Sequence, residues 1–512
     1  MRYIILALLL LGFTASEVRA QQEFANLDLP LRRAEDLVSV ADGDGNVCLY
    51  FFQGGSLHFS LVDATGQTVA TQEIPYRNNQ QPQVLGTRVT DTEFVFYSRY
   101  VNGNKEFVRP FAVNRYSGAF RSMPDVPLRK ERNETFMGAF ADADHFYMLY
   151  SDKKENLILY RELDESYYEK KTFPTADMPR TRTRHERQDE LIFVHPDLER
   201  TVFAGQHRSK IYTRGDKIYM VFDGFYLRGQ GKETTTEILT LDWPTGQTEY
   251  RTLPALPYKL KSNFNSFLHG NTLFRVLLDK EQFNLTAYDF NTLAPIKEYN
   301  YTAEQEIDIK ATPVHQRGAG ALFSSGNSVI EKTSKVMRNL STGRPAITVD
   351  AFNDSTLQLT IGSYQPPSRR NPHGGDPGRL VRTPDRLVQT SRGLYLMPGR
   401  WVPAYTLPYS YNMFPYNRYY YDPFFTRTGE QVGPGTSTYF RAVLDSETLD
   451  KVALAKTDST AATVQDKIEA YEEELKQTPE FKTLYRYGTN KLHYGYFDRR
   501  SKTFKIMEFT QN

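Results

Sequence analysis

Two stretches of the sequence concentrate side chains that can bind ligands. The first runs "RTRTRHER" and places Arg180, Arg182 and Arg184 at alternate positions. Guanidinium groups bind carboxylate, phosphate and sulfate groups through paired hydrogen bonds, so this run is a candidate anion-binding site. Alternation with threonine is also typical of a solvent-exposed edge strand. Both interpretations stay open from the sequence.

The second stretch is "YSYNMFPYNRYYYDPFF", residues 409–425, in which nine of seventeen residues are aromatic. Aromatic rings stack on sugar faces and dock protein partners. They also cover the apolar rim of a large parent fold, and this alternative stays open. If the stretch binds a partner, its candidate contact residues are Tyr411, Tyr416, Tyr419, Tyr420 and Tyr421.

Metal-ligating residue types occur in two places, but neither has the spacing of a standard site. His185, His195 and His207 are separated by ten and twelve residues, which matches no standard zinc site. The run "DGDGN" (42–46) resembles a calcium loop, but Val47 stands where the loop glycine belongs and no glutamate closes it. A turn between strands explains this run, and we predict no metal site.

Catalytic motifs of useful specificity do not occur in the chain. It contains no G-x-S-x-G, P-loop, H-E-x-x-H or C-x-x-C pattern. We therefore leave the catalytic residues unassigned and predict no cofactor. Whether the protein is an enzyme stays open, with a non-catalytic role favoured.

The first twenty residues have the pattern of a secretory signal peptide. Arg2 precedes the apolar run "YIILALLLLGF", and Val18 and Ala20 are small residues at the −3 and −1 positions of a cleavage site. The run is too short to span a bilayer, and no later run approaches that length. We expect cleavage after Ala20 and a soluble protein that is periplasmic or extracellular, without a transmembrane segment.

The charge and the cysteine content limit which partners the protein can bind and what can stabilise its fold. The formal net charge is +2, which provides no electrostatic case for nucleic-acid binding. Cys48 is the sole cysteine, so an intrachain disulfide is impossible. It lies in the apolar run "NVCLYFF", where a buried thiol is favoured over a reactive one. The fold must therefore be held together by its hydrophobic core.

A repeat of about fifty residues organises the chain. "FSLVDATGQTVATQEI" (59–74) and "LTLDWPTGQTEYRTL" (239–253) share an apolar strand, an aspartate, a Thr-Gly-Gln-Thr turn and a second strand. An Asp or Asn that follows a strand accepts backbone N–H groups two or three residues on and closes a tight turn. We predict such turns at Asp63, Asp164, Asp242, Asp289, Asp445 and Asp498, and also at Asn114 and Asn339.

A second strand pair precedes most of these turns. Examples are "DLVSVADGDGNVCLYFF" (36–52), "SKIYTRGDKIYMVFD" (209–223) and "NSFLHGNTLFRVLLD" (265–279). Four short antiparallel strands in each repeat are typical of a β-propeller. We predict an all-β protein with seven or eight four-stranded blades, eight being preferred. The last strands (481–509) are expected to complete a blade with the segment 24–31, which protects the sheet edges.

The repeats resemble those of known propeller superfamilies. "VSVADGDGNVCLYFF" is similar to the first strand pair of NHL-type blades, and "LTAYDFNTLAPIKEY" and "LTLDWPTGQTEYRTL" resemble the outer hairpins of quinoprotein-like propellers. The resemblance implies a propeller fold over most of the mature chain. Quinoprotein repeats carry tryptophans, whereas this chain has only Trp243 and Trp401. This departure counts against a quinone cofactor.

Residues 21–512 are expected to form a single propeller domain with two insertions, at about 176–208 and 365–436. The second holds eleven of the 27 prolines, so regular structure cannot continue throughout it. We expect much of it to fold down over one face of the domain. A helix is predicted at about 460–476, where Val464, Ile468, Tyr471 and Leu475 recur at helical spacing.

These features favour an exported binding or scaffold protein. It would recognise a protein or glycan partner through the face that bears the large insertion. The alternative is a propeller-fold glycan hydrolase or lyase, because propellers host both kinds of function. The sequence assigns neither the ligand nor the oligomeric state.

Overall fold

A computed structural model describes residues 21–510, and all structural statements below concern this described part. The residues outside the description within that range are 32–33, 54, 76–82, 103–104, 129–130, 132, 155, 165–166, 176–190, 195–201, 229–230, 254–262, 318–326, 331–332, 354, 366–379, 383–385, 391–392, 398–400, 404–435, 453–466, 469–470, 473, 476–479 and 488–490. Two compact units can be distinguished. Unit 1 consists of residues 1–74 and 462–512, and unit 2 of residues 75–461.

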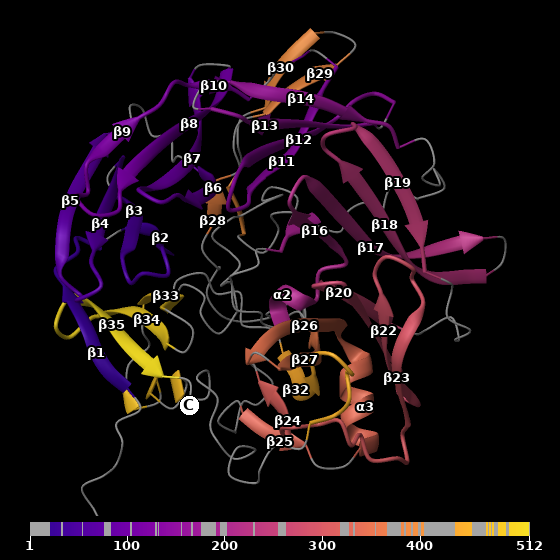
Figure 1. The fold of residues 1–512 in the computed structure, drawn as a ribbon. Coiled ribbons are helices and arrows are strands. Elements are labelled where there is room, and N and C mark those ends of the chain that lie inside the picture. The colour runs from indigo at the N-terminus through magenta and orange to yellow at the C-terminus, as the bar shows by residue number, and fades with distance from the viewer. Residues whose placement is uncertain are drawn as a thin grey trace, which may run out of the picture. The chain divides into compact units, whose positions relative to one another are not determined.

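Unit 1 contains two four-stranded antiparallel sheets (Figure 1). Sheet A pairs one N-terminal strand with three C-terminal strands in the order β1-β35-β34-β33, as predicted for the chain ends. Sheet B is a meander of four consecutive strands. The bounds are β1 Gln21–Leu27, β33 Glu480–Tyr487, β34 Lys491–Asp498 and β35 Thr503–Thr510 for sheet A, and β2 Glu35–Ala41, β3 Val47–Gln53, β4 Ser56–Val62 and β5 Thr68–Pro75 for sheet B.

Unit 2 contains five sheets, each built around the same meander. Sheet C consists of β6 Gln83–Val89, β7 Glu93–Asn102, β8 Lys105–Asn114, β9 Phe120–Ser122 and β10 Val126–Pro127. Sheet D consists of β11 Thr135–Ala141, β12 Phe146–Ser151, β13 Leu157–Glu162 and β14 Tyr168–Phe173. Sheet E consists of β15 Leu191–Phe193, β16 Ser209–Arg214, β17 Lys217–Arg228, β18 Gly231–Asp242 and β19 Gln247–Thr252.

Sheets F and G complete the five. Sheet F consists of β20 Asn263–His269, β21 Thr272–Leu278, β22 Gln282–Asp289 and β23 Pro295–Thr302. Sheet G has the order β25-β24-β32-β27-β26, with bounds β24 Val314–Arg317, β25 Asn327–Ile330, β26 Arg344–Asn353, β27 Thr356–Gln365 and β32 Thr436–Asp445. Two antiparallel two-stranded ladders, β28 Leu380–Arg382 with β31 Trp401–Pro403 and β29 Arg386–Thr390 with β30 Gly393–Met397, lie within the 365–436 insertion.

The described residues thus form seven sheets of four or five strands, the lower of the two expected blade numbers, besides the two two-stranded ladders. Eight blades were preferred partly because Asn339 was counted as the turn of one of the repeats. Asn339 instead lies in helix α3, Thr333–Thr342, whose residues Val336, Met337 and Leu340 are buried. These apolar residues at helical spacing pack the helix against sheet G, so the turn prediction at Asn339 was wrong.

Asp498 also occupies a different kind of turn from the one its repeat implied. It lies between β34 and β35, the second and third strands of sheet A counted from β33. The corresponding turns at Asp63, Asp242 and Asp289 lie between third and fourth strands. The difference arises because the fourth strand of sheet A is β1, which the N-terminal segment contributes.

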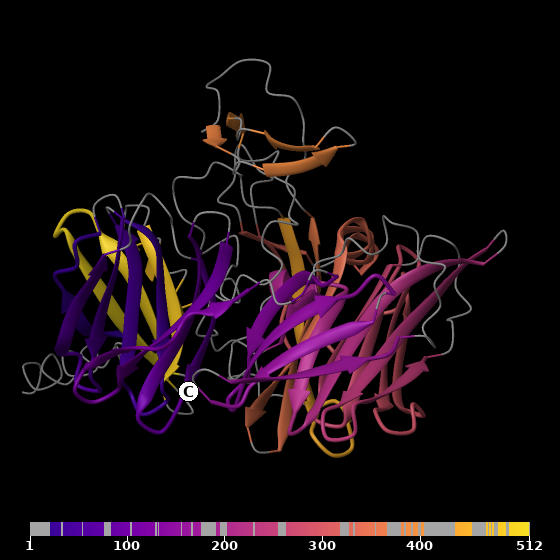
Figure 2. The same ribbon diagram turned by 90° about the horizontal axis from the view of Figure 1, so that it is seen from above.

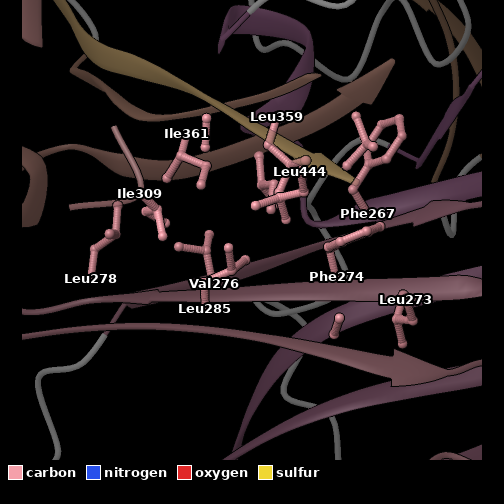
Figure 3. Close-up of a cluster of buried hydrophobic side chains, with 14 of the residues drawn as sticks. Phe267, Leu273, Phe274, Val276, Leu278, Leu285, Ile309, Leu359, Ile361 and Leu444 are labelled. Atoms are coloured by element: carbon pink, nitrogen blue, oxygen red, sulfur yellow. The ribbon is translucent and has the colours of Figure 1, made fainter. Parts of the chain in front are cut away.

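Buried apolar side chains fill the space between successive sheets of unit 2. One continuous cluster includes Val221 of sheet E, Phe274 of sheet F and Leu359 of sheet G. Figure 3 shows Val276 and Leu285 of sheet F facing Leu359, Ile361 and Leu444 of sheet G. A second cluster joins sheets C, D and E. Burial of this apolar surface is the main favourable term in the stability of a fold without disulfides.

Basic side chains also bind the turns of the next sheet along the chain. Arg88 of sheet C donates to the carbonyl oxygen of Asp144 in sheet D at 2.9 Å. Arg251 of sheet E donates to the carbonyl oxygens of Phe290 and Asn291 in sheet F, at 3.0 and 2.7 Å. These bonds satisfy carbonyl groups that a turn leaves without a strand partner.

The predicted helix near residue 470 is described in part. Lys467, Ile468, Tyr471, Glu472 and Glu474 are helical, and Ile468 is fully buried. The Tyr471 hydroxyl lies 2.8 Å from that of Tyr496 in β34. These contacts agree with a helix that packs its apolar side on sheet A. None of the helices among the described residues is long and apolar enough to cross a membrane.

Candidate functional site

The binding residues predicted from sequence lie outside the described part of the chain. This applies to Arg180, Arg182 and Arg184, and to the five tyrosines Tyr411, Tyr416, Tyr419, Tyr420 and Tyr421. His185 and His195 are outside it as well, whereas His207 is described. Their roles therefore stay predictions. The structure does describe the strand ends at which the two insertions leave and rejoin the sheets.

The aspartates of the repeat lie at strand ends and bind turn backbone. Asp289 Oδ1 accepts from the N–H of Thr292 at 2.7 Å and of Asn291 at 3.1 Å. Asp242 Oδ1 accepts from Thr245 N at 3.0 Å, and Asp445 Oδ1 from Thr448 N at 2.8 Å. The remaining members bind in the same way, namely Asp63 to Thr65 and Gln67, Asp164 to Tyr167, and Asp498 to Arg500.

Connections at the two edges of the unit 2 sheets differ in length. At the edge where first strands end, called the turn edge below, the connections between strands of one sheet have two to five residues, such as 215–216 and 290–294, and the longer segment 446–479 leaves sheet G there. The opposite edge, called the loop edge, carries the connection 366–435 within sheet G. Two segments that precede first strands also reach it, namely 174–208, which contains β15 and α2, and 331–343, which contains α3. In Figure 2 the salmon helix α3 lies at the loop edge and the gold loop that follows β32 at the turn edge.

The large insertion begins and ends at neighbouring backbone positions. β27 ends at Gln365 and β32 begins at Thr436, and these two residues are paired across the antiparallel ladder. A segment of about seventy residues therefore leaves and rejoins sheet G within one strand pair. The ladder between β27 and β32 is therefore complete up to the two residues that flank the segment.

The end of the first insertion packs on sheet G. Helix α2, Val202–Gly205, contacts β26, β27 and β32. Val202 packs with Ala346, Tyr364 and Tyr439 of sheet G. A Cβ added to Gly205 would lie 2.8 Å from Thr348 Cγ2 and 3.0 Å from Ile347 O. Only glycine allows this close approach of α2 to β26.

Lys210 connects this segment to sheets E and F. Its side chain is 1% exposed, and Nζ donates to the carbonyl oxygen of His207, to Asn265 Oδ1 at 2.7 Å and to Ser266 O at 2.8 Å. Burial lowers the pKa of Lys210 to about 8, against the opposing effect of Asp223. A protonated ammonium with three acceptors is a satisfied structural group.

Asp223 is the buried counter-charge of this network. It is 3% exposed and accepts from Thr236 Oγ1 at 2.7 Å, Ser266 N at 2.7 Å and Ser266 Oγ at 2.9 Å. Two of these donors come from sheet F and one from sheet E. Asp223 therefore ties the two sheets together and is fully engaged as an acceptor.

Three further basic residues surround the network at the loop edge. His207 and Arg208 are half-buried and precede β16, while Arg344 is exposed and is the first residue of β26. Burial first, and then the positive charges of Lys210 and Arg344, lower the pKa of His207 to about 3. His207 is therefore neutral at neutral pH, and Arg208 and Arg344 are cationic.

Asp142, Asp144 and His145 are the group of the described residues whose spacing fits a metal ion, with ligand atoms within 4.8 Å of one another. They form the turn between β11 and β12. Asp142 Oδ1 accepts from Asp144 N at 3.0 Å and His145 N at 2.7 Å. Burial first, and then the positive charge of Arg161, lowers the pKa of His145, an effect that Asp142 and Asp144 oppose. We interpret the group as a closed turn.

The other two sequence candidates also have structural roles. In the "DGDGN" run, Asp42 Oδ1 accepts from Asp44 N at 2.8 Å and Asn46 N at 3.0 Å, which is the predicted turn. Cys48 is fully buried in β3, and burial raises its pKa. A protonated buried thiol is a poor nucleophile, in agreement with the interpretation as a small apolar residue.

The loop-edge basic residues were not predicted as a group. Lys210 occupies an inward position of "SKIYT", and Arg344 follows a segment that was counted as a turn. The alternation of polar and apolar residues in β16 is the only local signal. The grouping depends on three strands that lie more than fifty residues apart in sequence.

Seven sheets of four or five strands, each containing an antiparallel meander, define the chain as a protein of the β-propeller class, although β15 is added parallel to β16 at one edge of sheet E. No family model and no curated sequence matches it. Solved structures of propellers are similar to it at a coarse level. An ACO/RPE65 chimera shares 10% identity, with 53% of this chain and 63% of the chimera covered and a TM-score of 0.28.

Two further solved structures show comparable likeness. The WD40 domain of SCAP from fission yeast has 6% identity, covers 65% of this chain and 95% of that domain, and has a TM-score of 0.27. Kuenenia stuttgartiensis hydrazine synthase has 11% identity, 65% and 80% coverage and a TM-score of 0.28. The chain spans less than two thirds of the length of the chimera. At such low similarity, the class assignment depends on the sheets of this chain.

Proposed function

We propose that the protein is an exported, non-catalytic β-propeller that recognises a protein or glycan partner through the loop edge of unit 2. The observation that carries the proposal is the difference between the two edges. Within the sheets of unit 2, turn-edge connections have two to five residues, whereas the loop edge carries the connection 366–435. The first insertion and the α3 segment also reach the loop edge, before β16 and β26. Long loops on a rigid scaffold are where proteins place binding residues.

The chemistry of the large insertion supports recognition by contact. Its aromatic stretch offers large, rigid contact area, and its arginines suit anionic groups. A rigid scaffold below it reduces the entropy lost on binding. The candidate contacts are Tyr411, Tyr416, Tyr419, Tyr420 and Tyr421 of this insertion, and Arg180, Arg182 and Arg184 of the other.

Excision of the insertion tests the proposal. Because Gln365 and Thr436 are paired, residues 366–435 can be replaced by a two-residue Asn-Gly turn that suits a hairpin. We expect a variant with unchanged far-UV circular dichroism that loses binding on a glycan array and in cross-linking to co-purified proteins. Unfolding of this variant would instead show that the insertion covers the core.

A surface variant provides the matched control. Serine substitution at the five candidate tyrosines is expected to abolish binding in the intact chain. Tyr116 and Tyr167 are 61% and 59% exposed at turns of the turn edge, so their substitution by serine should leave binding unchanged. Equal loss in both variants would contradict recognition at the loop edge.

Turnover assays address the enzymatic alternative. The purified protein would be incubated with neutral and acidic polysaccharides, and the products measured as reducing ends and as unsaturated sugars. We expect no turnover above that of a heat-denatured sample. Sustained release of either product would replace the binding proposal with a hydrolase or lyase.

Export is part of the proposal and has its own test. Cleavage after Ala20 would leave Gln21 as the first residue, which is also the first residue of β1. Intact-mass measurement of protein from the periplasm or medium of its host should yield the mass of residues 21–512. Retention of the full-length mass in the cytoplasm would overturn it.

A further inference from the structure

We propose that β5, the last strand of sheet B, pairs with β5 of a second copy of this chain and forms an antiparallel two-fold dimer. A dimer contact in unit 1 goes beyond the recognition proposed for the loop edge of unit 2. It does not depend on that function, since the two involve different sheets.

The backbone of β5 has a strand partner on one side. Among the described residues, its neighbour in sheet B is β4, and the sheet ends at β5. Six of its eight residues are exposed, and Val69 keeps 40% of its surface accessible. The N–H and C=O groups on the open side of an edge strand are a template for pairing with another extended chain.

The turn before β5 determines which backbone groups point to the open side. Asp63 N donates to Gln67 O at 2.9 Å, so these two residues form a hydrogen-bonded pair. Such pairs recur at every second residue of an antiparallel ladder, so the odd-numbered residues of β5 bond to β4. The residues that direct their N–H and C=O groups to the open side are Thr68, Ala70, Gln72 and Ile74.

A two-fold axis at Thr71 satisfies all of these groups. Thr71 then lies opposite Thr71 of the second copy. Ala70 lies opposite the second copy's Gln72, and Thr68 lies opposite its Ile74, so that each pair exchanges two N–H···O=C bonds. Opposed threonines are a favourable cross-strand pair. The strand is therefore complementary to itself, as a two-fold contact requires.

Charge also favours a second copy as the occupant. Glu73 is the one charged residue in the sequence of β5, and in this register it lies opposite Val69. Like charges therefore do not oppose each other within the pair. The last strand of sheet D differs, because Lys170 and Lys171 lie at its centre. A two-fold axis at the centre of β14 sets one of these lysines against its own copy.

The last strands of sheets E and F also carry a basic residue. These are Arg251 in β19 and Lys297 in β23. Charged side chains, above all lysine, are a usual means by which proteins prevent edge-to-edge pairing. The sequence of β5 contains no lysine or arginine. It therefore permits a contact that charge disfavours at the comparable strands.

The size of the contact predicts a weak dimer. One pair of eight-residue strands covers less than a standard specific interface, which buries about 1,600 Å² in total. We therefore expect a dissociation constant on the order of 10–100 μM. Monomer and dimer should both be populated across that range.

Sedimentation equilibrium of the full mature chain tests for this dimer. Samples from about 5 to 300 μM span the expected dissociation constant. We expect a reversible equilibrium between monomer and dimer. A monomer at every concentration would overturn the proposal.

Charge variants at Thr71 make the test specific to this register. Thr71 is exposed, so its substitution should leave the far-UV circular dichroism unchanged. Thr71→Lys and Thr71→Glu each oppose like charges across the axis and should weaken self-association about fivefold or more. An equimolar mixture of the two variants opposes lysine to glutamate and should associate at least as strongly as wild type.

The matched control is Thr252→Lys. It makes the same change at an exposed position of β19 and should leave self-association within about twofold, as surface substitutions away from a contact do. Equal weakening by Thr71→Lys and Thr252→Lys would mean a general charge effect and overturn the proposal. A mixture of the two Thr71 variants that associates no better than its components would overturn it as well.

The excision variant separates this dimer from the recognition function. Because β5 belongs to unit 1, replacement of 366–435 should leave the dimer intact, and loss of the dimer would place the contact at the insertion and refute pairing through β5. A variant that keeps both its dimer and its partners would refute the recognition proposal alone. A monomeric chain whose β5 cross-links to an extended segment of another protein would refute the second copy as the occupant.

Discussion

The ammonium nitrogen of Lys210 lies 2.7 Å from Oδ1 of Asn265, and this bond joins the first strands of sheets E and F. Both side chains are buried, with exposed fractions of 1% and 0%. Ser266 and Asp223 extend the connection. A polar network of this kind is stabilising only while each member keeps its partners.

Lys210→Met is therefore expected to destabilise the protein by about 3 kcal/mol, since it leaves Asp223 as an uncompensated buried charge. Urea unfolding monitored by circular dichroism measures the change. Addition of Asp223→Asn should recover part of the loss, because the asparagine carries no charge. This account would be contradicted if the double variant lost more free energy of unfolding than the two single variants lose together.

The same lysine predicts a dependence of stability on alkaline pH. Its pKa is about 8 in the folded protein and 10.5 ordinarily. Between these values the unfolded chain binds more protons than the folded one, so the free energy of unfolding rises with pH. The contribution is present above 10.5 and lost as pH falls through 8. The difference between wild type and Lys210→Met should change across this interval, and a constant difference would refute the prediction.

His493 predicts a loss of stability on acidification. Its Nδ1 lies 3.2 Å from the Tyr485 hydroxyl and its Nε2 3.2 Å from Glu508 Oε2. Burial lowers its pKa below the ordinary 6.5, an effect that Glu508 opposes and Lys491 reinforces. Below pH 6.5 the unfolded chain takes up a proton more readily than the folded one, so the free energy of unfolding decreases as the pH decreases.

Unfolding experiments between about pH 7.5 and 5.5 measure this effect. Wild type should lose more stability than His493→Gln over the interval, since the variant lacks the titrating group. Parallel pH profiles would show that His493 is protonated in the folded protein without cost.

Gly205→Ala tests the seating of α2 on sheet G. The added methyl group would meet Thr348 Cγ2 at 2.8 Å and Ile347 O at 3.0 Å. We expect a loss of about 1–3 kcal/mol from overpacking, although alanine is the better helix former. Thr348→Ser removes the opposing methyl group and should restore part of the stability. No change in Gly205→Ala would mean that α2 is displaced without cost.

The role of the turn aspartates predicts that substitutions at Asp289 lower thermal stability according to whether the side-chain acceptor is kept. Asp289→Ala removes the acceptor for Asn291 and Thr292 and should lower the melting temperature by about 2 °C. Asp289→Asn keeps the acceptor, as Asn114 does in sheet C, and should be close to wild type near neutral pH.

Acidification changes the wild type relative to both variants, because neither variant carries the titrating carboxylate. Backbone hydrogen bonds lower the pKa of Asp289 below its ordinary value of 3.8. Its contribution is present above 3.8 and lost as pH falls through the folded pKa. The wild type should therefore approach Asp289→Ala in strong acid, whereas Asp289→Asn should keep its advantage.

Much of the architecture could be predicted because it depends on local residue patterns. An aspartate after an apolar strand specifies a turn through its own neighbours, so Asp63, Asp242 and Asp289 mark repeats in the sequence. The pairing of β1 with β35 follows from strands that lack a partner at each end of the chain. The insertion bounds follow from the loss of the fifty-residue period.

The tertiary structure alone decided what the repeats bring together. It placed Asn339 in a helix, because Val336 and Leu340 have a buried face against sheet G that the turn pattern concealed. It brought Lys210, Asn265 and Arg344 to one edge from three different sheets. Such proximity depends on how strands separated by many residues pack, and local side-chain preferences carry no record of it.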